Sequence, residues 1–411
     1  MRILCLLEKY PFPANSGSRR RVLRLVSSLR EGNDLKVVVV PRWQDLAQDE
    51  ELRAAQRLDL FPPTTVVTPS PRKVLLKERV LWLSGRSLPF GWQSCDVSSA
   101  VAHVASVVRT FSPDVVWVAS SALGAAVLPL DLEAPVVVDL QHSEKQSIDR
   151  QLRQWARGFP RTKASWRLIA LTVLDRRARI RTEAAGVGRA SLLTPCSELV
   201  AADLPRVSTE GRTIVRNGVD VPEEMGWEPT SGRLLFVGNL GYPPNSEAVR
   251  TLLHDFLPQM RRVIPGVELH VVGAGGAALN DLWSVENVVW HGFVDDLAPQ
   301  YKSAALVVAP LDFGSGTKLK IIEAFAHGVP VVTTPTGVEG LDVSGREVAV
   351  GTSVPELVEL ALALLNDPGR ADLQRQRARD WVERTHTWAS AGDQLRRAVK
   401  ELVDPSIGAS S

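Results

Sequence analysis

Cysteine is scarce in this sequence. The 411 residues include three cysteines, Cys5, Cys95 and Cys196, which lie far apart and form no CxxC pair. A sparse, odd set of this kind argues against a disulfide framework and a cysteine-based zinc site, and it favours a reducing cytoplasm. We expect each cysteine to be a small buried apolar residue.

Long apolar runs are also missing. No run approaches the roughly 20 apolar residues of a transmembrane helix. The apolar start at 2–7 is stopped by Glu8 and Lys9, so it does not predict a signal peptide. These absences predict a cytoplasmic protein.

Neither sign of charge is in large excess. The formal net charge is +2, so bulk charge does not predict a nucleic-acid partner. The basic residues are nevertheless clustered, because segment 143–181 holds eleven lysines and arginines against three acids. Such a segment is compatible with peripheral contact to an anionic membrane, helped by Trp155 and Trp166, and equally with a solvated helical face.

Several catalytic signatures are absent. The chain has no Gly-x-Ser-x-Gly, no His-Glu-x-x-His and no Asp-x-Asp at a strand end. Asp295 and Asp296 are adjacent, and we expect them to open a helix, where acids suit the helix dipole. We therefore predict that no metal ion is required.

Short β-branched runs are plentiful and nearly all apolar. Strands buried on both faces of a parallel sheet have this composition, and their alternation with helical segments predicts doubly wound α/β domains. The ten runs lie at 2–7, 35–40, 115–120, 135–141, 190–195, 233–239, 267–273, 287–292, 304–310 and 329–334.

The helical segments and a break in periodicity suggest the domain plan. A helix capped by Asn245 is predicted to run to about Val263, and the tail from Trp388 to position 403 is amphipathic. Segment 197–232 carries no long periodic element. We predict an N-terminal Rossmann-like domain at 1–205, a C-terminal one at 206–387, and a C-terminal segment at 388–411 whose helix crosses back to the first domain. Ligands in such folds bind at the carboxyl ends of the strands.

The stretch GSGTKLKIIEAFAHGVP, at 314–330, follows one of these strands. Gly314 and Gly316 allow close backbone approach, and a helix is predicted to begin near Thr317, followed by Lys318 and Lys320. A helix N-terminus with nearby lysines can bind an anion, although a glycine turn with solvated lysines fits equally. The stretch matches neither the P-loop nor the dinucleotide fingerprint.

Glu323 lies two turns into the same predicted helix. One interpretation is a surface pair with Lys320, worth a few tenths of a kcal/mol. The other is a carboxylate that lies below a diphosphate site and accepts hydrogen bonds from both hydroxyls of a ribose. Geometry alone leaves both open.

The second half resembles the C-terminal domain of the family 4 glycosyltransferases. The resemblance rests on FVGNLGYPPNSEAV, PGVELHVVG and VVWHGFVDDL, followed by AALVVAPL and GSGTKLKIIEAFAHGVPVVTTPTGVEGL. In the first half, YPFPANSGSRRRVLRLVSSL, TPCSE and RNGVD also agree with the family. The resemblance covers about 1–390 and implies the GT-B fold and a retaining transfer from a nucleotide-diphosphate sugar.

The resemblance implies roles for residues of the second half. Of two family glutamates eight positions apart, the second matches Glu323 and implies a ribose ligand, and the first falls on Ser315. A GxGTxLKxxEA pattern marks a polysaccharide-type branch, so we interpret Ser315 as a branch feature. The family often has an arginine and a lysine after the strand that here ends in Gly238 and Asn239; no lysine follows there, and Lys318 and Lys320 are the expected substitutes.

The nucleotide base should lie near HGFVDDL. In similar enzymes the residues after the strand-end glycine, here Phe293 and Val294, flank the base, although core packing of Phe293 fits as well. The residues do not identify the base, and UDP is favoured over GDP as the carrier.

The first half supplies further candidates. By the resemblance, Gly17 makes a close backbone contact to the donor phosphate or the acceptor. His142 follows a strand at the functional edge and is a candidate catalytic residue together with Lys318 and Glu323; Asp139 either orients His142 or simply packs. The arginines at 19–21 and 24 open the helix after Gly17, and most are expected to be solvated.

The acceptor is predicted to contact the first domain. Trp82, Phe90 and Trp92 could stack on a sugar or an aromatic aglycone, or they pack at helix ends. The acceptor would carry a hydroxyl on a glycan, a lipid-linked glycan or a small natural product. A nucleotide-sugar isomerase or hydrolase of the same fold, and a non-catalytic nucleotide-sugar-binding protein, are the alternatives.

Overall fold

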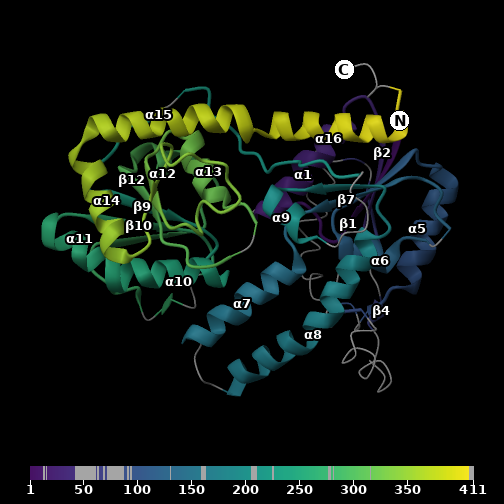
Figure 1. Ribbon diagram of the computed structural model, residues 1–411, viewed down its shortest axis with the longest axis horizontal. Helices are drawn as coiled ribbons and strands as arrows, with labels where there is room; N and C mark the ends of the chain where they lie inside the picture. The colour runs from purple at the N-terminus through teal and green to yellow at the C-terminus, as the bar shows by residue number, and fades with distance from the viewer. Residues whose placement is uncertain are drawn as a thin grey trace. The chain divides into compact units, whose positions relative to one another are not determined.

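The chain forms two compact units. Figure 1 shows the computed structural model, in which Met1–Arg216 and Ala389–Ser411 form unit 1 and Asn217–Trp388 form unit 2. The structure describes residues 1–12, 14, 16–41, 62, 64–67, 70–71, 88–89, 92, 95–129, 131–158, 163–204, 211–224, 226–275, 279–280, 282–314 and 316–406.

Unit 1 is built on a six-stranded parallel sheet with the order β3-β2-β1-β6-β7-β8. Its strands are β1 (Arg2–Leu7), β2 (Asp34–Val39), β3 (Thr64–Val66), β6 (Val115–Val118), β7 (Val136–Leu140) and β8 (Leu192–Pro195). A separate antiparallel pair joins β4 (Ser70–Pro71) to β5 (Cys95–Asp96). The strand order reverses between β1 and β6, which is where ligands bind in doubly wound sheets.

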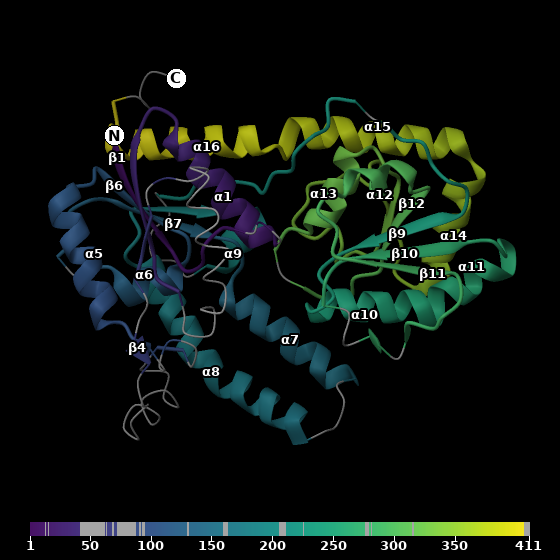
Figure 2. The same cartoon turned by 180° about the vertical axis from the view of Figure 1, so that it is seen from behind.

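Helices cover both faces of this sheet because most of its strand residues are apolar. Leu4 and Leu6 of β1 pack with α5 and α6 on one face, and α1 and α16 lie on the other side (Figure 2). Within unit 1, the α16 residue Arg396 donates a hydrogen bond to the backbone oxygen of Ser28 in α1. The helices are α1 (Gly17–Arg30), α5 (Ser98–Phe111), α6 (Ser121–Val127), α7 (Glu144–Gly158), α8 (Lys163–Val187), α9 (Glu198–Asp203) and α16 (Trp388–Val403).

Unit 2 repeats the same architecture. Its parallel sheet has the order β11-β10-β9-β12-β13-β14, so the order reverses between β9 and β12. The helices α10 and α13 lie on opposite sides of these strands (Figures 1 and 2). The strands are β9 (Arg233–Val237), β10 (Glu268–Val272), β11 (Val288–Gly292), β12 (Leu306–Ala309), β13 (Val331–Thr333) and β14 (Ala349–Val350). The helices are α10 (Pro243–Thr251), η2 (Leu252–Phe256), α11 (Leu257–Val263), α12 (Ala298–Ser303), α13 (Leu319–Ala326), α14 (Val354–Asn366) and α15 (Pro368–Thr385).

The predicted pair of Rossmann-like doubly wound domains is confirmed, whereas the predicted start of the helix after β9 is wrong. Asn245 does not cap the helix after β9; the helix begins at Pro243, with Tyr242 at the cap position. Proline suits a first turn because its missing N–H needs no partner there. The helix also passes through the π-helical turn η2, which directly precedes α11 and its Pro258, a residue that cannot join the regular ladder.

Candidate functional site

The first candidate region, the unit-2 site, lies at the carboxyl ends of β9 and β12. The loop at 310–318 connects β12 to α13. Gly314 and Gly316 have φ angles of 128° and 72°, which residues with a side chain rarely adopt. Lys318 is buried, and its Nζ donates to the backbone oxygens of Gly314 (3.3 Å) and Gly316 (2.8 Å). Lys318 thus stabilises the glycine loop, and α13 begins one residue later.

The neighbouring residues of this loop complete its description. Ser315 lies outside the described residues. The Oγ1 atom of Thr317 is buried, and no described residue offers it a hydrogen bond. The predicted helix start at Thr317 lies two residues before the observed start of α13 at Leu319.

Lys320 reaches from α13 to the loop that follows β9. Its ammonium group lies 4.2 Å from the centre of the Phe236 ring and donates to Oδ1 of Asn245. A Cβ atom at Gly238 would lie 2.8 Å from this ammonium nitrogen. Removal from water lowers the pKa of Lys320 to about 7, against the smaller attraction of Glu323.

Glu323 lies one turn further along α13 and is partly buried. Its Oε2 accepts a hydrogen bond from the hydroxyl of Tyr301 at 3.4 Å. The surface pair with Lys320 does not form, because the ammonium contacts Asn245 and Phe236 instead. The unit-2 site therefore places Lys320 beside Gly238, with Glu323 close enough to attract the ammonium group.

The loop after β9 is held by residues that the sequence interpretation missed. Asn245 donates from Nδ2 to the backbone oxygen of Asn239 at 2.8 Å. Gly273 follows β10, has a φ of 149°, and would place a Cβ atom 1.9 Å from the backbone oxygen of Gly238. Gly275 would similarly meet the backbone nitrogen of Gly241 at 2.5 Å. In the sequence, the glycine-rich run VVGAGG at the end of this strand could have indicated the close approach of the two backbones.

Phe293 and Val294 follow β11 with different surroundings. Phe293 is 59% exposed, so the interpretation of this residue as core packing is wrong. Val294 packs against the core of unit 2. Asp296 accepts a hydrogen bond at 2.9 Å from the backbone nitrogen of Ala298, the first residue of α12. The cap position is Leu297, so Asp295 and Asp296 precede this helix and do not open it.

The second candidate region, the unit-1 cavity, lies at the carboxyl ends of β1, β6 and β7. Its volume is about 420 Å³. It lies at the point where the strand order of unit 1 reverses. The described residues that line it are Glu8, Lys9, Ser18, Arg19, Val22, Pro89, Trp92, Ala119, Ser120, Ser121, Ala122, Asp139, Leu140, Gln141, His142, Glu144, Asp175, Arg179 and Glu183.

His142 lies in this cavity with a half-exposed side chain. Its Nε2 is 3.8 Å from Oε1 of Glu144. Partial removal from water lowers the pKa of His142, but the carboxylates of Glu144 and Glu183 outweigh this effect and the net pKa is raised. Glu144 also pairs with Arg179, and the two cations bring the pKa of Glu144 down to about 2 against the opposing effect of burial.

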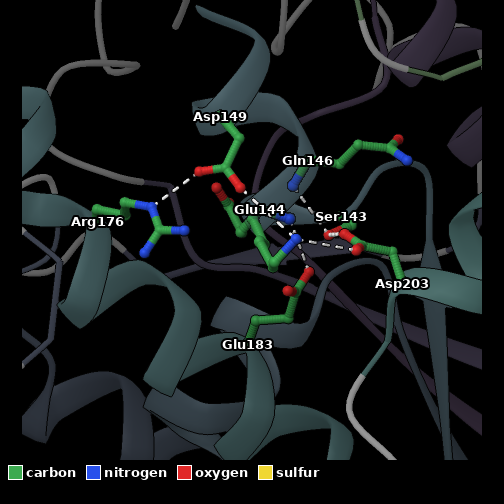
Figure 3. A network of polar contacts seen from close by, with 8 residues as sticks. Ser143, Glu144, Gln146, Asp149, Arg176, Glu183 and Asp203 are labelled. Carbon is green, nitrogen blue, oxygen red and sulfur yellow. Dashed lines mark hydrogen bonds and ion pairs between the residues drawn. The ribbon is translucent and has the colours of Figure 1, made fainter. Parts of the chain in front are cut away.

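A polar network fixes the start of α7, directly after His142. Figure 3 shows Ser143, Glu144, Gln146, Asp149, Arg176, Glu183 and Asp203. The hydroxyl of Ser143 accepts from the Gln146 backbone at 3.3 Å and donates to Asp203. Glu183 of α8 accepts from the backbone nitrogen of Glu144 at 2.9 Å. These bonds satisfy N–H groups of the first turn of α7, and they hold His142 at the cavity.

Asp139 does not orient His142. Both its carboxylate oxygens accept from Arg21, at 2.9 and 2.6 Å, and neither side chain is exposed. The hydroxyl of Thr194 donates to the same carboxylate at 3.0 Å. Of the arginines that open α1, Arg21 is therefore a buried structural cation, and Arg19 is the one that lines the cavity.

Gly17 and Trp92 of unit 1 both lie at or next to the cavity. Gly17 is the first residue of α1, after the cap residue Ser16, and the cavity is lined by the next two residues. Trp92 is 1% exposed and lines the cavity, and its indole N–H has no hydrogen-bond partner among the described residues. Trp82 and Phe90 lie outside the described residues.

The described residues of the basic segment 143–181 belong mainly to α7 and the first part of α8. Several of its cations are paired within unit 1, as Arg176 is with Asp149 at 2.9 Å. Trp155 is buried, whereas Trp166 is 60% exposed. Within the described parts of the chain, no helix is both long and apolar enough to cross a membrane. The same residues contain no group of three or more His, Cys, Asp or Glu side chains placed to hold a metal ion.

Comparison with known proteins assigns the second half of the chain. Residues 231–367 match the family model "Glycosyl transferases group 1". No curated protein matches the chain significantly. The matched segment contains the whole unit-2 site, and it identifies the chain as a glycosyltransferase.

Solved structures share the whole fold at low sequence identity. HepE of Anabaena in complex with UDP is 16% identical, with a TM-score of 0.67 over 98% of this chain and 100% of that one. Sucrose-phosphate synthase of Thermosynechococcus elongatus is 15% identical, with a TM-score of 0.67 over 98% and 99%. WaaG, a glycosyltransferase involved in lipopolysaccharide biosynthesis, is 15% identical, with a TM-score of 0.61 over 98% and 100%. The fold is therefore of the GT-B type.

Proposed function

We propose that this chain is a retaining family 4 glycosyltransferase of the GxGTxLKxxEA branch. It moves a sugar from a nucleotide-diphosphate sugar, with UDP favoured over GDP, to a hydroxyl of a glycan, a lipid-linked glycan or a small natural product. The observation that carries the proposal is the meeting of Gly238 and Lys320 at the strand-order reversal of unit 2, with Glu323 one turn further along α13. HepE, which has the same fold, was solved with UDP and with UDP-glucose, and this supports UDP as the carrier.

In this proposal the unit-2 site binds the donor. Lys320 and the backbone N–H groups at the start of α13 face the diphosphate, since a helix N-terminus and a cation both favour negative charge. Glu323 accepts hydrogen bonds from the ribose hydroxyls, and the exposed ring of Phe293 lies against the base. Lys318 acts indirectly, by holding the glycine loop that approaches the phosphates.

The unit-1 cavity is the proposed acceptor site. Carbohydrate sites combine an aromatic wall with charged groups that bond hydroxyls, and the cavity offers Trp92 together with His142 and Glu144. His142 is the proposed contact to the reacting hydroxyl. If the acceptor is lipid-linked, the basic segment 143–181 would contact the membrane surface, and vesicles containing anionic lipid would co-sediment with the protein.

The proposed chemistry breaks the bond between the anomeric carbon and the diphosphate. Negative charge grows on the leaving oxygen, and preorganised donors aimed at that charge lower the barrier; one such donor is typically worth ~3 kcal/mol. We propose a same-face attack in which the leaving phosphate takes the acceptor proton. The helix N-terminus and the lysines of the 314–330 stretch stabilise the diphosphate charge in this proposal, so no metal is required. A covalent glycosyl-enzyme, or a product of inverted configuration seen by NMR, would contradict this mechanism.

Nucleotide release separates this function from its alternatives. The purified protein is incubated with UDP- and GDP-sugars, with and without candidate acceptors, and free nucleotide is measured. Release that needs an acceptor supports transfer. Release without any acceptor supports a hydrolase, sugar rearrangement without release supports an isomerase, and binding without turnover supports a non-catalytic binding protein.

A further inference from the structure

Among the residues that the structure describes, the ammonium group of Lys320 has no counter-ion bonded to it. Its contacts among the described residues are one hydrogen bond to Asn245 and the face of the Phe236 ring. An ammonium can donate three hydrogen bonds, so this one is under-used. Charges that are removed from water in proteins are normally paired, and a cation without its pair next to a ligand site indicates that the ligand supplies the anion.

The charged groups around Lys320 do not replace that anion. Glu323, one turn along α13, attracts the ammonium but does not bond it, and Lys318 repels it. Asn245 of α10 and Phe236 of β9 carry no charge, and Tyr301 of α12 bonds to Glu323. Desolvation dominates this balance, so the pKa of Lys320 falls to about 7.

Lys318 shows the contrast within the same stretch. Its ammonium is satisfied by two loop oxygens, Gly314 and Gly316, so it is already used by the protein. Position 238 adds a second contrast, because only a glycine there leaves room for the Lys320 ammonium beside the loop after β9. Lys320 is therefore the lysine of this stretch that is left for a ligand.

We propose that the donor diphosphate is the counter-ion of Lys320, and that Lys320 takes up a proton from solvent as the donor binds. This inference rests on the proposed function of the unit-2 site. No covalent bond changes; a proton moves from water to Nζ of Lys320, and the resulting cation bonds a phosphate oxygen. Lys320 therefore carries its full positive charge, which stabilises the leaving diphosphate, only when the donor is bound.

The coupling between proton uptake and donor binding fixes how donor affinity depends on pH. Below about pH 7 the lysine is already charged in the free protein, so affinity does not depend on its protonation. Above that pH the free lysine is neutral, and binding must supply one proton, so affinity falls by up to about tenfold per pH unit. A nucleotide-diphosphate sugar is a suitable probe because it lacks the terminal phosphate that titrates near neutral pH in UDP.

Calorimetry with UDP-glucose tests the proposal. Titrations at about pH 8, in two buffers of different ionisation enthalpy, should show uptake of close to one proton per donor bound. Lys320→Arg, which stays charged, should bind without this uptake, and Lys320→Met should bind at least tenfold more weakly. Lys302→Met, which removes a half-exposed lysine of α12, should behave like the native protein.

The outcomes separate this inference from the proposed function. If UDP-glucose binds without proton uptake, or if Lys320→Arg keeps the same uptake, the inference is wrong and donor binding stands. If neither UDP-glucose nor a GDP-sugar binds, the proposed function fails and the inference with it. The ligand-free protein gives an independent check: after reductive ¹³C-methylation, one lysine resonance that is absent from Lys320→Arg should titrate near pH 7, and its absence would overturn the proposal.

Discussion

Gly238 and Lys320 occupy complementary space. They lie 82 positions apart in the sequence, yet a Cβ atom at Gly238 would approach both Nζ of Lys320 and Nδ2 of Asn245 to 2.8 Å. Real Cβ atoms do not come this close to neighbours, so a side chain at position 238 and the present position of Lys320 exclude each other.

Gly238→Ala should therefore weaken donor binding. The extra methyl group displaces the side chains of Lys320 and Asn245, and we expect donor affinity to fall about tenfold, or ~1.4 kcal/mol, measured by calorimetry. The matched control is Gly266→Ala, where a Cβ atom meets nothing within 4 Å. Equal donor affinity in the two variants would show that Lys320 is not needed at its observed position.

Glu323→Ala should weaken donor binding further. A hydrogen bond to a charged group contributes ~1.5–3 kcal/mol, so we expect a loss of about 10- to 100-fold in affinity for the whole nucleotide sugar. Glu323→Gln keeps one acceptor and should lie between the two. Glu359→Ala, at an exposed position of α14, is the control. The ribose role is refuted if Glu323→Ala binds the donor as tightly as the native protein.

His142→Ala should affect transfer and spare donor binding. The side chain lies in the unit-1 cavity, whereas the donor contacts proposed above all belong to unit 2. We expect acceptor-dependent nucleotide release to fall at least tenfold, which corresponds to the loss of one contact that orients the acceptor hydroxyl. His254→Ala, at an exposed position of unit 2, is the matched control. A fall in donor affinity without a fall in transfer rate would contradict the acceptor role.

The sheet cores could be predicted from the sequence because a strand that is buried on both faces consists of a continuous run of apolar residues. The run from Arg2 to Leu7 is apolar almost throughout, and its residues from Ile3 onwards are buried. A very short strand has no apolar run that is long enough to recognise. The strand β14 has two residues, Ala349 and Val350, and was missed. Strand ends follow from the strands, so the positions of Gly238, Lys320 and Glu323 near one another could also be predicted.

Pairings across long sequence distances could not be predicted. Arg21 stands in a run of arginines at the start of a helix, which resembles a solvated surface, and its partner Asp139 lies 118 positions away. Asn245 looked like a cap because it follows two prolines, but its side chain serves the loop after β9 and Lys320. Such contacts depend on how the elements fold together, and no local pattern specifies them.

Breaking the pair of Arg21 and Asp139 should strongly destabilise unit 1. Both side chains are fully buried, so Arg21→Ala leaves an uncompensated buried carboxylate, at a cost of ~3–5 kcal/mol. Urea unfolding followed by circular dichroism measures the loss, with Arg30→Ala, an exposed position of the same helix, as the control. In the double variant with Asp139→Ala the second substitution should cost much less than it does alone. Additive losses would mean that the two side chains do not act as a pair.

Glu183→Gln should stabilise the protein at high pH. Burial, partly opposed by the hydrogen bond from the Glu144 backbone and reinforced by the nearby Glu144 charge, raises the pKa of Glu183 to about 7. The folded state therefore holds this proton where the unfolded state, with a pKa near 4.5, has lost it. Stability then falls as pH rises from about 4.5 to about 7, by up to ~3 kcal/mol.

Glutamine keeps an oxygen for the Glu144 backbone bond and removes the charge. The native protein and Glu183→Gln should therefore have similar unfolding free energies near pH 4.5, and the variant should be more stable above about pH 7. Urea titrations at several pH values measure both curves. Glu359→Gln, at an exposed position, should follow the native curve throughout. If Glu183→Gln also follows it, the carboxyl group of Glu183 is ionised at neutral pH, and the raised pKa is wrong.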